Sequence, residues 1–375
     1  MKIPQELQIR RKRTRSVDVG GVGIGGENPV RIQSMCNTPT EDVKATVEQI
    51  KGLADAGCEL VRVAVPDEAA ARSLGAIKRA ISIPLIADIH FHWKYALIAL
   101  EEGVDKLRLN PGNIGERARV ESIVEKAKVR GVPIRIGVNA GSLEKSLLKR
   151  DGRPTPEAML ESGLNHIRIL EEMDFQDIVL SMKASNIPMT VAAYRLASQN
   201  LDYPLHLGVT EAGTLMRGTV QSAAALGALL LEGIGDTLRI SLTADSVEEV
   251  RVAKLLLESL GLRKGRAKVI SCPSCGRADV DVFKLADEVE KRAQEIGEDI
   301  SIAVLGCEVN GPGESREADF GIAGGRQAGA LYVNGVPVRK VEEDRLVDEL
   351  FDEIKRQLAQ RRLSGESSSK NPAPH

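Results

Sequence analysis

Short apolar runs alternate with longer amphipathic stretches over roughly the first two thirds of the chain. The short runs have the length and composition of buried strands, and the longer stretches carry apolar residues at the spacing of one helical face. The predicted strands cover residues 31–36, 60–65, 84–90, 105–110, 133–139, 178–184, 204–210 and 237–242. The predicted helices cover residues 41–56, 67–80, 93–102, 115–130, 154–172, 188–199, 215–232 and 246–259. Eight strand–helix units in succession predict an α/β fold, a (β/α)8 TIM barrel over residues 31–259.

The composition changes after residue 259, which indicates a second domain. A basic linker over 261–266 leads into further elements, namely strand 267–271, helix 281–296, strand 300–305, short strands near 319–323 and 329–334, and helix 343–358. This order predicts a small α+β domain over residues 266–358, followed by a disordered tail over 359–375. For residues 1–30 the sequence predicts a solvated basic arm followed by a hairpin. The hairpin contains the glycine-rich segment 20–26 and is expected at the base of the fold.

Alternation within the predicted strands places several charged side chains inside the barrel, because successive residues of a strand point to opposite faces. The cations on the inward face are Arg62, Arg108, Arg135, Lys183 and Arg239. Asp88 is the one acid on that face, and Glu211 lies just past the end of a strand. Guanidinium groups bind phosphate oxygens in pairs, so the pattern predicts a ligand with more than one phosphate. The alternative is an internal salt-bridge network closed by Asp88, Glu211 and other loop acids.

Three cysteines of the second domain are spaced as candidate metal ligands. Cys272 and Cys275 form a Cys-x-x-Cys turn, and Cys307 follows the next predicted strand, shortly before Glu314 on a Gly-Pro-Gly turn. Three thiolates fit an iron–sulfur cluster with one iron left for another ligand, a position that Glu314 can take. Structural zinc and unliganded thiols remain the alternatives. Cys36 and Cys58 are expected to be packing residues, although Cys36 places an extra, oxidation-sensitive thiol near the barrel mouth.

Charge and hydropathy exclude several classes of partner. The formal net charge is −2, and the basic run near the start has no interleaved aromatic residues, so no nucleic-acid partner is expected. The longest apolar run, 223–231, is too short to cross a bilayer. An odd number of cysteines in a chain that shows no secretory signal predicts reduced thiols and a cytoplasmic protein.

Four segments resemble a known enzyme family. They are Ala87–Phe91, Leu107–Gly115, Arg135–Glu144, and Ser271–Gly276 together with Cys307–Glu314. The chain is similar to 4-hydroxy-3-methylbut-2-enyl diphosphate synthases of the methylerythritol phosphate route to isoprenoids, in their bacterial two-domain form. The resemblance implies a reductive, ring-opening dehydration of 2-C-methyl-D-erythritol 2,4-cyclodiphosphate, with electrons supplied by flavodoxin or ferredoxin. It also implies a homodimer in which one subunit's cluster domain closes over the other's barrel.

The resemblance further assigns roles to individual residues. It implies a 4Fe–4S cluster held by Cys272, Cys275, Cys307 and Glu314. It implies that the diphosphate is held by Arg62, Arg108, Arg135, Lys183, Arg239 and Ser241. The rest of the site would be lined by Asn110, Asn139, Asp88 and Glu211, with Glu314, Glu211 and Asp88 as the catalytic candidates and Glu211 as a candidate proton donor.

Overall fold

The structure is a computed structural model, and it describes residues 8–263, 265, 267–307, 318–325 and 328–364. These residues form two compact units, one covering Gln8–Arg263 and the other covering the described residues after it. Each unit has a hydrophobic core of its own. None of the helices in the described residues combines the length and the apolar composition needed to cross a membrane.

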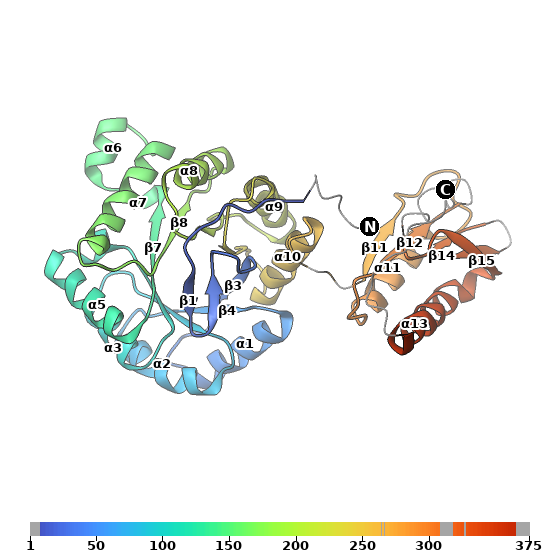
Figure 1. Cartoon of the computed structure of the whole chain (residues 1–375), viewed down its shortest axis with the longest axis horizontal. Coiled ribbons are helices and arrows are strands. Elements are labelled where there is room, and N and C mark those ends of the chain that lie inside the picture. The colour runs from blue at the N-terminus through green and yellow to red at the C-terminus, as the bar shows by residue number, and fades with distance from the viewer. Residues whose placement is uncertain (1–7, 264, 266, 308–317, 326–327, 365–375) are drawn as a thin grey trace. The chain divides into compact units, whose positions relative to one another are not determined.

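The first unit is a barrel of parallel strands (Figure 1). Its strands are β3 (Arg31–Met35), β4 (Leu60–Ala64), β5 (Leu85–Asp88), β6 (Lys106–Leu109), β7 (Ile134–Asn139), β8 (Ile178–Lys183), β9 (His206–Leu207) and β10 (Thr237–Leu238). Their order in the sheet is β8-β7-β6-β5-β4-β3-β10-β9, and a parallel bridge between Leu180 and Leu205 links its two ends. The predicted TIM barrel is therefore confirmed, although β9 and β10 are shorter than the predicted runs 204–210 and 237–242.

Helices follow the strands and surround the barrel (Figure 1). The main helices are α1 (Val43–Ala56), α2 (Glu68–Ala80), α3 (Trp93–Glu101), α5 (Arg117–Arg130), α7 (Pro156–Glu171), α8 (Ile187–Asn200), α9 (Leu215–Leu231) and α10 (Ser246–Ser259). Side-chain caps fix where several of them begin: Asp42 accepts from the Ala45 N–H before α1, and Asp67 accepts from the Ala70 N–H before α2. Three short helices in the loops after β6 and β7 were not predicted, namely α4 (Pro111–Ile114), η2 (Ala140–Ser142) and α6 (Lys145–Asp151).

A hairpin closes the amino-terminal end of the barrel. Strands β1 (Val17–Val19) and β2 (Val22–Ile24) pair in antiparallel register, as the glycine-rich segment predicted. Val19 and Ile24 form one buried apolar cluster with Leu60 and Ile86, which lie near the starts of β4 and β5. Because these four side chains exclude water, apolar groups seal the barrel at its amino-terminal end.

Over residues 8–16 the basic segment is anchored to the barrel, so the predicted solvated arm was wrong there, although Arg10 and Arg13 are exposed. Arg11 donates to the buried carboxylate of Asp236 at 2.7 Å, and Thr14 donates to the same oxygen at 3.0 Å. The backbone N–H of Lys12 donates to Gly233, and that of Arg15 to Asp202. A run of positive residues read as exposed therefore includes an arginine that anchors the segment to the loop before β10.

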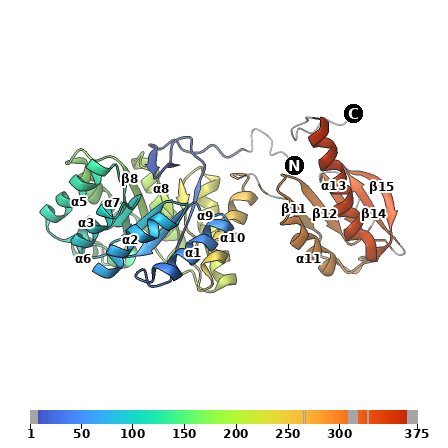
Figure 2. The same ribbon diagram turned by 90° about the horizontal axis from the view of Figure 1, so that it is seen from below.

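The second unit is a five-stranded mixed sheet with two helices packed on it (Figure 2). Its strands, in their order across the sheet, are β11 (Lys268–Ser271), β12 (Ser301–Leu305), β13 (Phe320–Ala323), β14 (Gly329–Val333) and β15 (Val336–Val341). The first three strands are parallel, and the last two pairings are antiparallel. Helices α11 (Val282–Ala293) and α13 (Leu346–Ser364) bury apolar side chains in one core with the inner strands.

One strand and one helix boundary in this unit differ from the sequence-based prediction. Strand β15 was not predicted at all. Helix α13 continues to Ser364 instead of ending at residue 358, so the predicted disordered tail was wrong over 359–364. The rest of that predicted tail, 365–375, lies outside the described residues.

Candidate active site

The cations that alternation predicted to point inward do lie inside the barrel. Arg62, Arg108, Arg135 and Lys183 are buried on β4, β6, β7 and β8, and Arg239 follows directly after β10. The strand register sets Arg108 beside Arg135 on the neighbouring strand. The charges of all four arginines lower the pKa of Lys183, in addition to its burial, which indicates that the five cations share one region of the barrel.

Asp88 ties two of these cations together. Its Oδ1 accepts from Arg108 Nη1 at 3.0 Å, and its Oδ2 lies 3.5 Å from Arg62 Nε and 3.5 Å from His90 Nε2. Burial by itself would raise the pKa of Asp88, but the charges of Arg62 and Arg108 and the His90 contact hold that pKa far below its ordinary value. The carboxylate therefore stays ionised throughout the physiological range and orients the arginines on either side of it.

Arg239 has a carboxylate of its own. Its Nε and Nη2 donate to Glu249 Oε2 and Oε1, at 3.2 and 3.0 Å. The sulfur of Met35 lies between Arg239 and Arg62, 3.8 Å from Arg239 Nη1 and 2.9 Å from Arg62 Nη2. Five cations thus face two carboxylates, Asp88 and Glu249, and an excess of positive charge remains.

Two glycines on the inward face make room for the long cationic side chains. A Cβ at Gly137, on β7, would lie 2.7 Å from Arg108 Nε, and a Cβ at Gly208, just after β9, would lie 2.5 Å from Lys183 Nζ. Neither glycine needs a left-handed backbone, so the requirement at both positions is for space. The sequence therefore provides both the cations and the gaps they occupy.

The deeper part of the barrel holds polar groups without partners among the described residues. They include Arg135 Nε and Nη1, Lys106 Nζ, both ring nitrogens of His206, and the amide of Gln33. Arg135 is 1% exposed and Lys106 is fully buried. Burial first, and then neighbouring cations, holds the pKa values of Arg135, Lys106, Lys183 and His206 well below their ordinary values. Donors of this kind are costly to bury unpaired, and an anion would supply both acceptors and countercharge.

The other candidates from the sequence lie at the carboxyl ends of the strands, where TIM-barrel active sites form. Asn110 follows β6 and is buried, and Asn139 ends β7 and is half-buried. Ser241, after β10, is half-buried as well. Glu211, in the loop after β9, is exposed and has a φ of 56°, a conformation rare outside glycine and asparagine. The described contacts therefore join Arg62 and Arg108 to Asp88 and Arg239 to Glu249, and none of these contacts joins Glu211 or Ser241 to these groups.

Sequence reasoning missed Glu249 and Met35 as parts of this cluster, and it placed His90 on the inward face without giving it a role. Glu249 lies on α10, where an acid near the start of an amphipathic helix indicates an exposed face. Met35 occupies an inward position of β3, but a thioether carries no signal for contacts with arginine. His90 shares the inward parity of Asp88, and that parity was the one available clue.

The three cysteines of the second unit lie at the carboxyl ends of two adjacent parallel strands. Cys272 follows β11 and Cys307 follows β12, and the backbone N–H of Cys272 donates to Val304 on that neighbouring strand. Cys275 is exposed on the turn after β11, where Ser274 has a φ of 60°. In the described part of the chain, no three His, Cys, Asp or Glu side chains are already gathered at metal-binding distance.

The surroundings of these thiols fit a soft metal centre. The Gly306 N–H donates to Cys272 Sγ at 3.3 Å, the kind of contact that tunes iron–sulfur sites. Hydrogen bonds from Arg277, first from its backbone and then from its side chain, lower the pKa of Cys275, which favours the thiolate that binds metals. Glu314, the predicted fourth ligand, lies outside the described residues.

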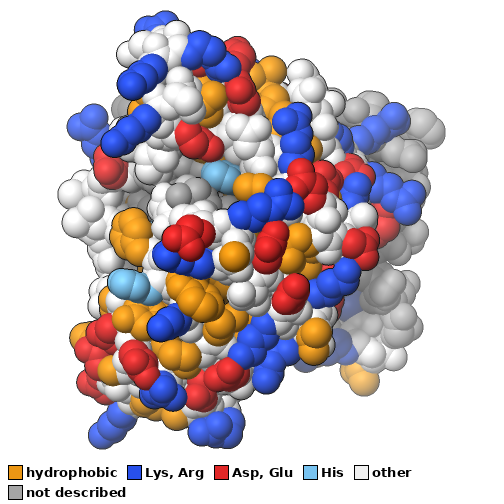
Figure 3. All heavy atoms as spheres, turned by 90° about the vertical axis from the view of Figure 1, so that its left-hand side faces the viewer, with side chains coloured by type: hydrophobic (Ala, Val, Ile, Leu, Met, Phe, Trp, Pro, Cys, Tyr) orange, Lys and Arg blue, Asp and Glu red, His pale blue; other side chains and the backbone are white. Residues whose placement is uncertain are grey.

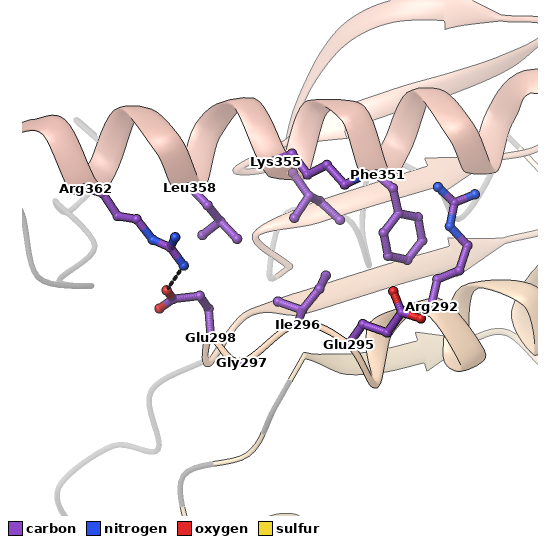
Figure 4. Close-up of a pocket in the computed structure, with 10 residues that line it drawn as sticks. Arg292, Glu295, Ile296, Gly297, Glu298, Phe351, Lys355, Leu358 and Arg362 are labelled. Carbon is purple, nitrogen blue, oxygen red and sulfur yellow. Dashed lines mark hydrogen bonds and ion pairs between the residues drawn. The ribbon is translucent and has the colours of Figure 1, made fainter.

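Two other surfaces do not form a comparable site. On the side of the barrel that carries α5 and α6, basic and acidic side chains are interspersed instead of forming a patch of one sign (Figure 3). In the second unit, a hollow of about 260 Å³ lies between α13 and the end of α11 (Figure 4). Three of the charged groups that line it are paired, because Arg362 bonds Glu298 at 3.0 Å and Arg292 bonds Asp348 at 2.8 Å.

Comparison with known proteins gives consistent matches over both units. The family model for the GcpE TIM-barrel domain matches residues 14–254, and that for the GcpE protein C-terminal domain matches residues 268–356. The chain is 58% identical over 349 residues to the 4-hydroxy-3-methylbut-2-en-1-yl diphosphate synthase (flavodoxin) of Geobacter sulfurreducens, covering 93% of this chain and 99% of that protein. It is 55% identical over 348 residues to the protein of the same name from Caldanaerobacter subterraneus, covering 93% of this chain and 98% of that protein.

Proposed function

The chain belongs to the GcpE family, and from this premise we propose that it is a 4-hydroxy-3-methylbut-2-en-1-yl diphosphate synthase of isoprenoid precursor biosynthesis. The proposed reaction is the reductive, ring-opening dehydration of 2-C-methyl-D-erythritol 2,4-cyclodiphosphate. It takes up two electrons and yields the linear hydroxymethylbutenyl diphosphate.

The observation that carries this proposal is the cation cluster inside the barrel. Arg62, Arg108, Arg135, Lys183 and Arg239 converge there, while Asp88 and Glu249 supply two negative charges. A cyclic diphosphate matches this excess charge, and its oxygens suit the donors of Arg135 that lack partners in the described structure. Because apolar side chains seal the amino-terminal end of the barrel, we expect the ligand at the carboxyl end, beside Asn110, Asn139 and Ser241.

The two remaining acids have separate proposed roles. Asp88 is held ionised by Arg62 and Arg108, so we assign it to orienting these arginines and not to donating a proton. Glu211 lies on an exposed loop at the carboxyl end of the barrel, where it can exchange protons with solvent, and we propose it as the proton donor.

We propose that Cys272, Cys275 and Cys307 hold a 4Fe–4S cluster, with Glu314 as the fourth ligand. Three thiols on adjacent loops, one with a backbone N–H directed at its sulfur, support this assignment. Such a cluster supplies single electrons and a Lewis-acidic iron to the reaction when it is bound. The proposed electron donor is flavodoxin, with ferredoxin as the alternative, and the proposed form is a cytoplasmic homodimer.

The proposal is tested on protein purified without oxygen. Iron, zinc and acid-labile sulfide are measured first, and turnover of the cyclodiphosphate with reduced flavodoxin is measured second. The proposal predicts about four irons and four sulfides per chain, flavodoxin-dependent product formation, and the mass of a dimer by sedimentation. One zinc per chain with no turnover would overturn it and favour a phosphate-binding barrel with a structural zinc domain.

Substitutions separate the proposed ligands from one another. Cys307→Ser should lose the cluster, whereas Glu314→Ala should retain part of the iron and lose most of the turnover. Full activity of Glu314→Ala would contradict its assignment as the fourth ligand.

A further inference from the structure

Arg239 is held from behind by a buried carboxylate that belongs to a helix outside the barrel. Glu249, on α10, is 4% exposed and accepts from two nitrogens of the Arg239 guanidinium. The paired contact fixes the plane of the guanidinium group as well as its position, since a fork of two parallel hydrogen bonds leaves no free rotation. Arg239 is therefore oriented by a residue that lies behind it.

The carboxylate of Glu249 is itself immobilised by two further donors. Ser34 Oγ, on β3, donates to Oε2 at 2.9 Å, and the Leu242 N–H, after β10, donates to Oε1 at 3.1 Å. Each oxygen of Glu249 thus accepts one hydrogen bond from Arg239 and one from a neighbouring element. Through these contacts Glu249 links α10 to β3 and to the segment after β10. The position of Arg239 therefore depends on the pairing of the neighbouring strands β3 and β10.

The contacts of Arg239 also decide which part of the guanidinium is available to a ligand. Nε and Nη2 are used by Glu249, whereas the one hydrogen-bond partner that the described residues give Nη1 is the sulfur of Met35, at 3.8 Å. A thioether is a weak acceptor, so a phosphate oxygen would displace it readily. The same sulfur contacts Arg62 Nη2 at 2.9 Å, which places Arg62 on the other side of Met35.

We propose that Glu249 is a positioning residue for the anion site, and that it acts by fixing Arg239 so that Nη1 is presented to a phosphate group of the ligand. This inference rests on the proposed function for the identity of the substrate, but not for the presence of an anion site. Glu249 does not touch the ligand, so we assign its contribution to the contact with Arg239, although its charge also acts on Arg62.

The test measures binding of inorganic diphosphate by titration calorimetry, together with KM and kcat for the cyclodiphosphate, in Glu249→Gln. The amide cannot accept from both guanidinium nitrogens, so affinity for diphosphate should fall about tenfold and KM should rise by a similar factor, with kcat little changed. Glu248→Gln is the matched control, because Glu248 lies next to it on α10 and pairs only with Arg251 among its described contacts. That control should bind diphosphate as the wild type does.

A double-mutant cycle separates positioning from a general structural effect. In an Arg239→Met background, adding Glu249→Gln should produce no further loss of diphosphate affinity. An equal loss with and without Arg239 would overturn the proposal. Should Glu249→Gln not fold, Glu249→Asp keeps the charge but is one methylene shorter, and it should also weaken diphosphate binding; wild-type affinity in that folded variant would overturn the proposal.

Failure of the proposed function would be distinguishable from failure of this inference. A wild-type protein that binds diphosphate but does not turn over the cyclodiphosphate would contradict the proposed function only. The calorimetric cycle would still decide the role of Glu249.

Discussion

At the scale of single residues, the absence of a side chain at Gly137 matters as much as the presence of the cations. Gly137 and Arg108 occupy the inward faces of the neighbouring strands β7 and β6. The guanidinium of Arg108 fills the space where the Cβ of any other residue would stand. A methyl group here would meet the flexible end of a side chain and not the backbone, so its effect should fall on the site before it falls on the fold.

We therefore predict that Gly137→Ala folds and yet binds inorganic diphosphate about tenfold more weakly, because Arg108 is displaced from Asp88. Titration calorimetry measures the affinity, and thermal unfolding measures the stability. Gly52→Ala is the matched control, since a Cβ at Gly52, within α1, meets nothing within 4 Å. Wild-type affinity in Gly137→Ala would show that the position of Arg108 does not matter for the anion.

The five cysteines should differ sharply in reactivity. Burial raises the pKa of Cys36 to about 12, and burial likewise raises that of Cys58 to about 12, whereas hydrogen bonds from Arg277 lower the pKa of the exposed Cys275. In metal-free protein at pH 8, iodoacetamide should therefore modify Cys275 first and leave Cys36 and Cys58 unmodified, as peptide mass spectrometry can follow. Early labelling of Cys36 would instead support the sequence-based expectation of an oxidation-sensitive thiol at the barrel mouth.

Anion binding should be accompanied by proton uptake. Burial and the surrounding arginines depress the pKa of Lys183, and burial and neighbouring cations depress that of His206, so the free protein holds fewer protons than an ordinary lysine and histidine would. A bound anion favours the charged forms and raises both pKa values, so the complex should gain protons at a pH that lies between the pKa of the free form and that of the bound form. For the same reason, stability of the ligand-free protein should rise with pH until the ordinary lysine pKa is reached.

Titration with inorganic diphosphate in buffers of different ionisation enthalpy measures this uptake. Lys183→Met provides the control, because protonation of diphosphate itself is common to both proteins. The wild type should take up more protons per diphosphate than Lys183→Met, and equal counts would contradict the prediction.

At the scale of elements, the segment before the hairpin is anchored to the barrel by one buried carboxylate. Asp236 is 1% exposed and accepts from Arg11, from Thr14 and from the Leu205 N–H, so it joins the segment to the strands β9 and β10. Its removal leaves the half-buried guanidinium of Arg11 without a countercharge. The sequence offered no sign of this, because an aspartate in a glycine-rich loop is ordinarily exposed.

We predict that Asp236→Ala lowers the free energy of unfolding of the barrel by about 3 kcal/mol, since breaking one half of a buried pair leaves an unpaired charge. Urea denaturation measures the loss. Asp202→Ala, which removes the exposed ion pair with Arg15, should cost at most about 1 kcal/mol. Equal losses in the two variants would show that burial of the Asp236 contact does not contribute.

The elements that sequence reasoning missed share a physical cause. Strand β15 lies at the edge of its sheet and is mostly exposed, with Pro337, Arg339 and Lys340 in its sequence, so it lacks the apolar alternation that marks a strand. Its one signal was the Asn334-Gly335 turn, in which both residues have positive φ. Helix α6 is short, and of its residues only Leu147 is buried, so its pattern was too weak to be recognised.

At the scale of the whole molecule, local periodicity predicted the barrel and the interior cations because each strand obeys the same two-residue alternation. This alternation alone places Arg62, Arg108, Arg135 and Lys183 inside the barrel, where the structure finds them buried. The contacts that orient them were not predictable, since Glu249 reaches Arg239 from a helix and Asp236 reaches Arg11 from the far end of the unit's sequence. Periodicity gives the direction of a side chain, whereas the identity of its partner depends on how distant segments pack.

The apolar seal formed by Val19, Ile24, Leu60 and Ile86 has a consequence for how fast an anion arrives. The seal places apolar groups of low polarisability at the amino-terminal end of the barrel, next to the interior cations. The electric field of these cations is therefore weakly screened at that end, and it extends into solvent chiefly at the carboxyl end. The barrel then acts as a focusing element that draws anions toward one opening from beyond contact distance. Association of a diphosphate should accordingly slow as ionic strength rises, while its dissociation changes far less.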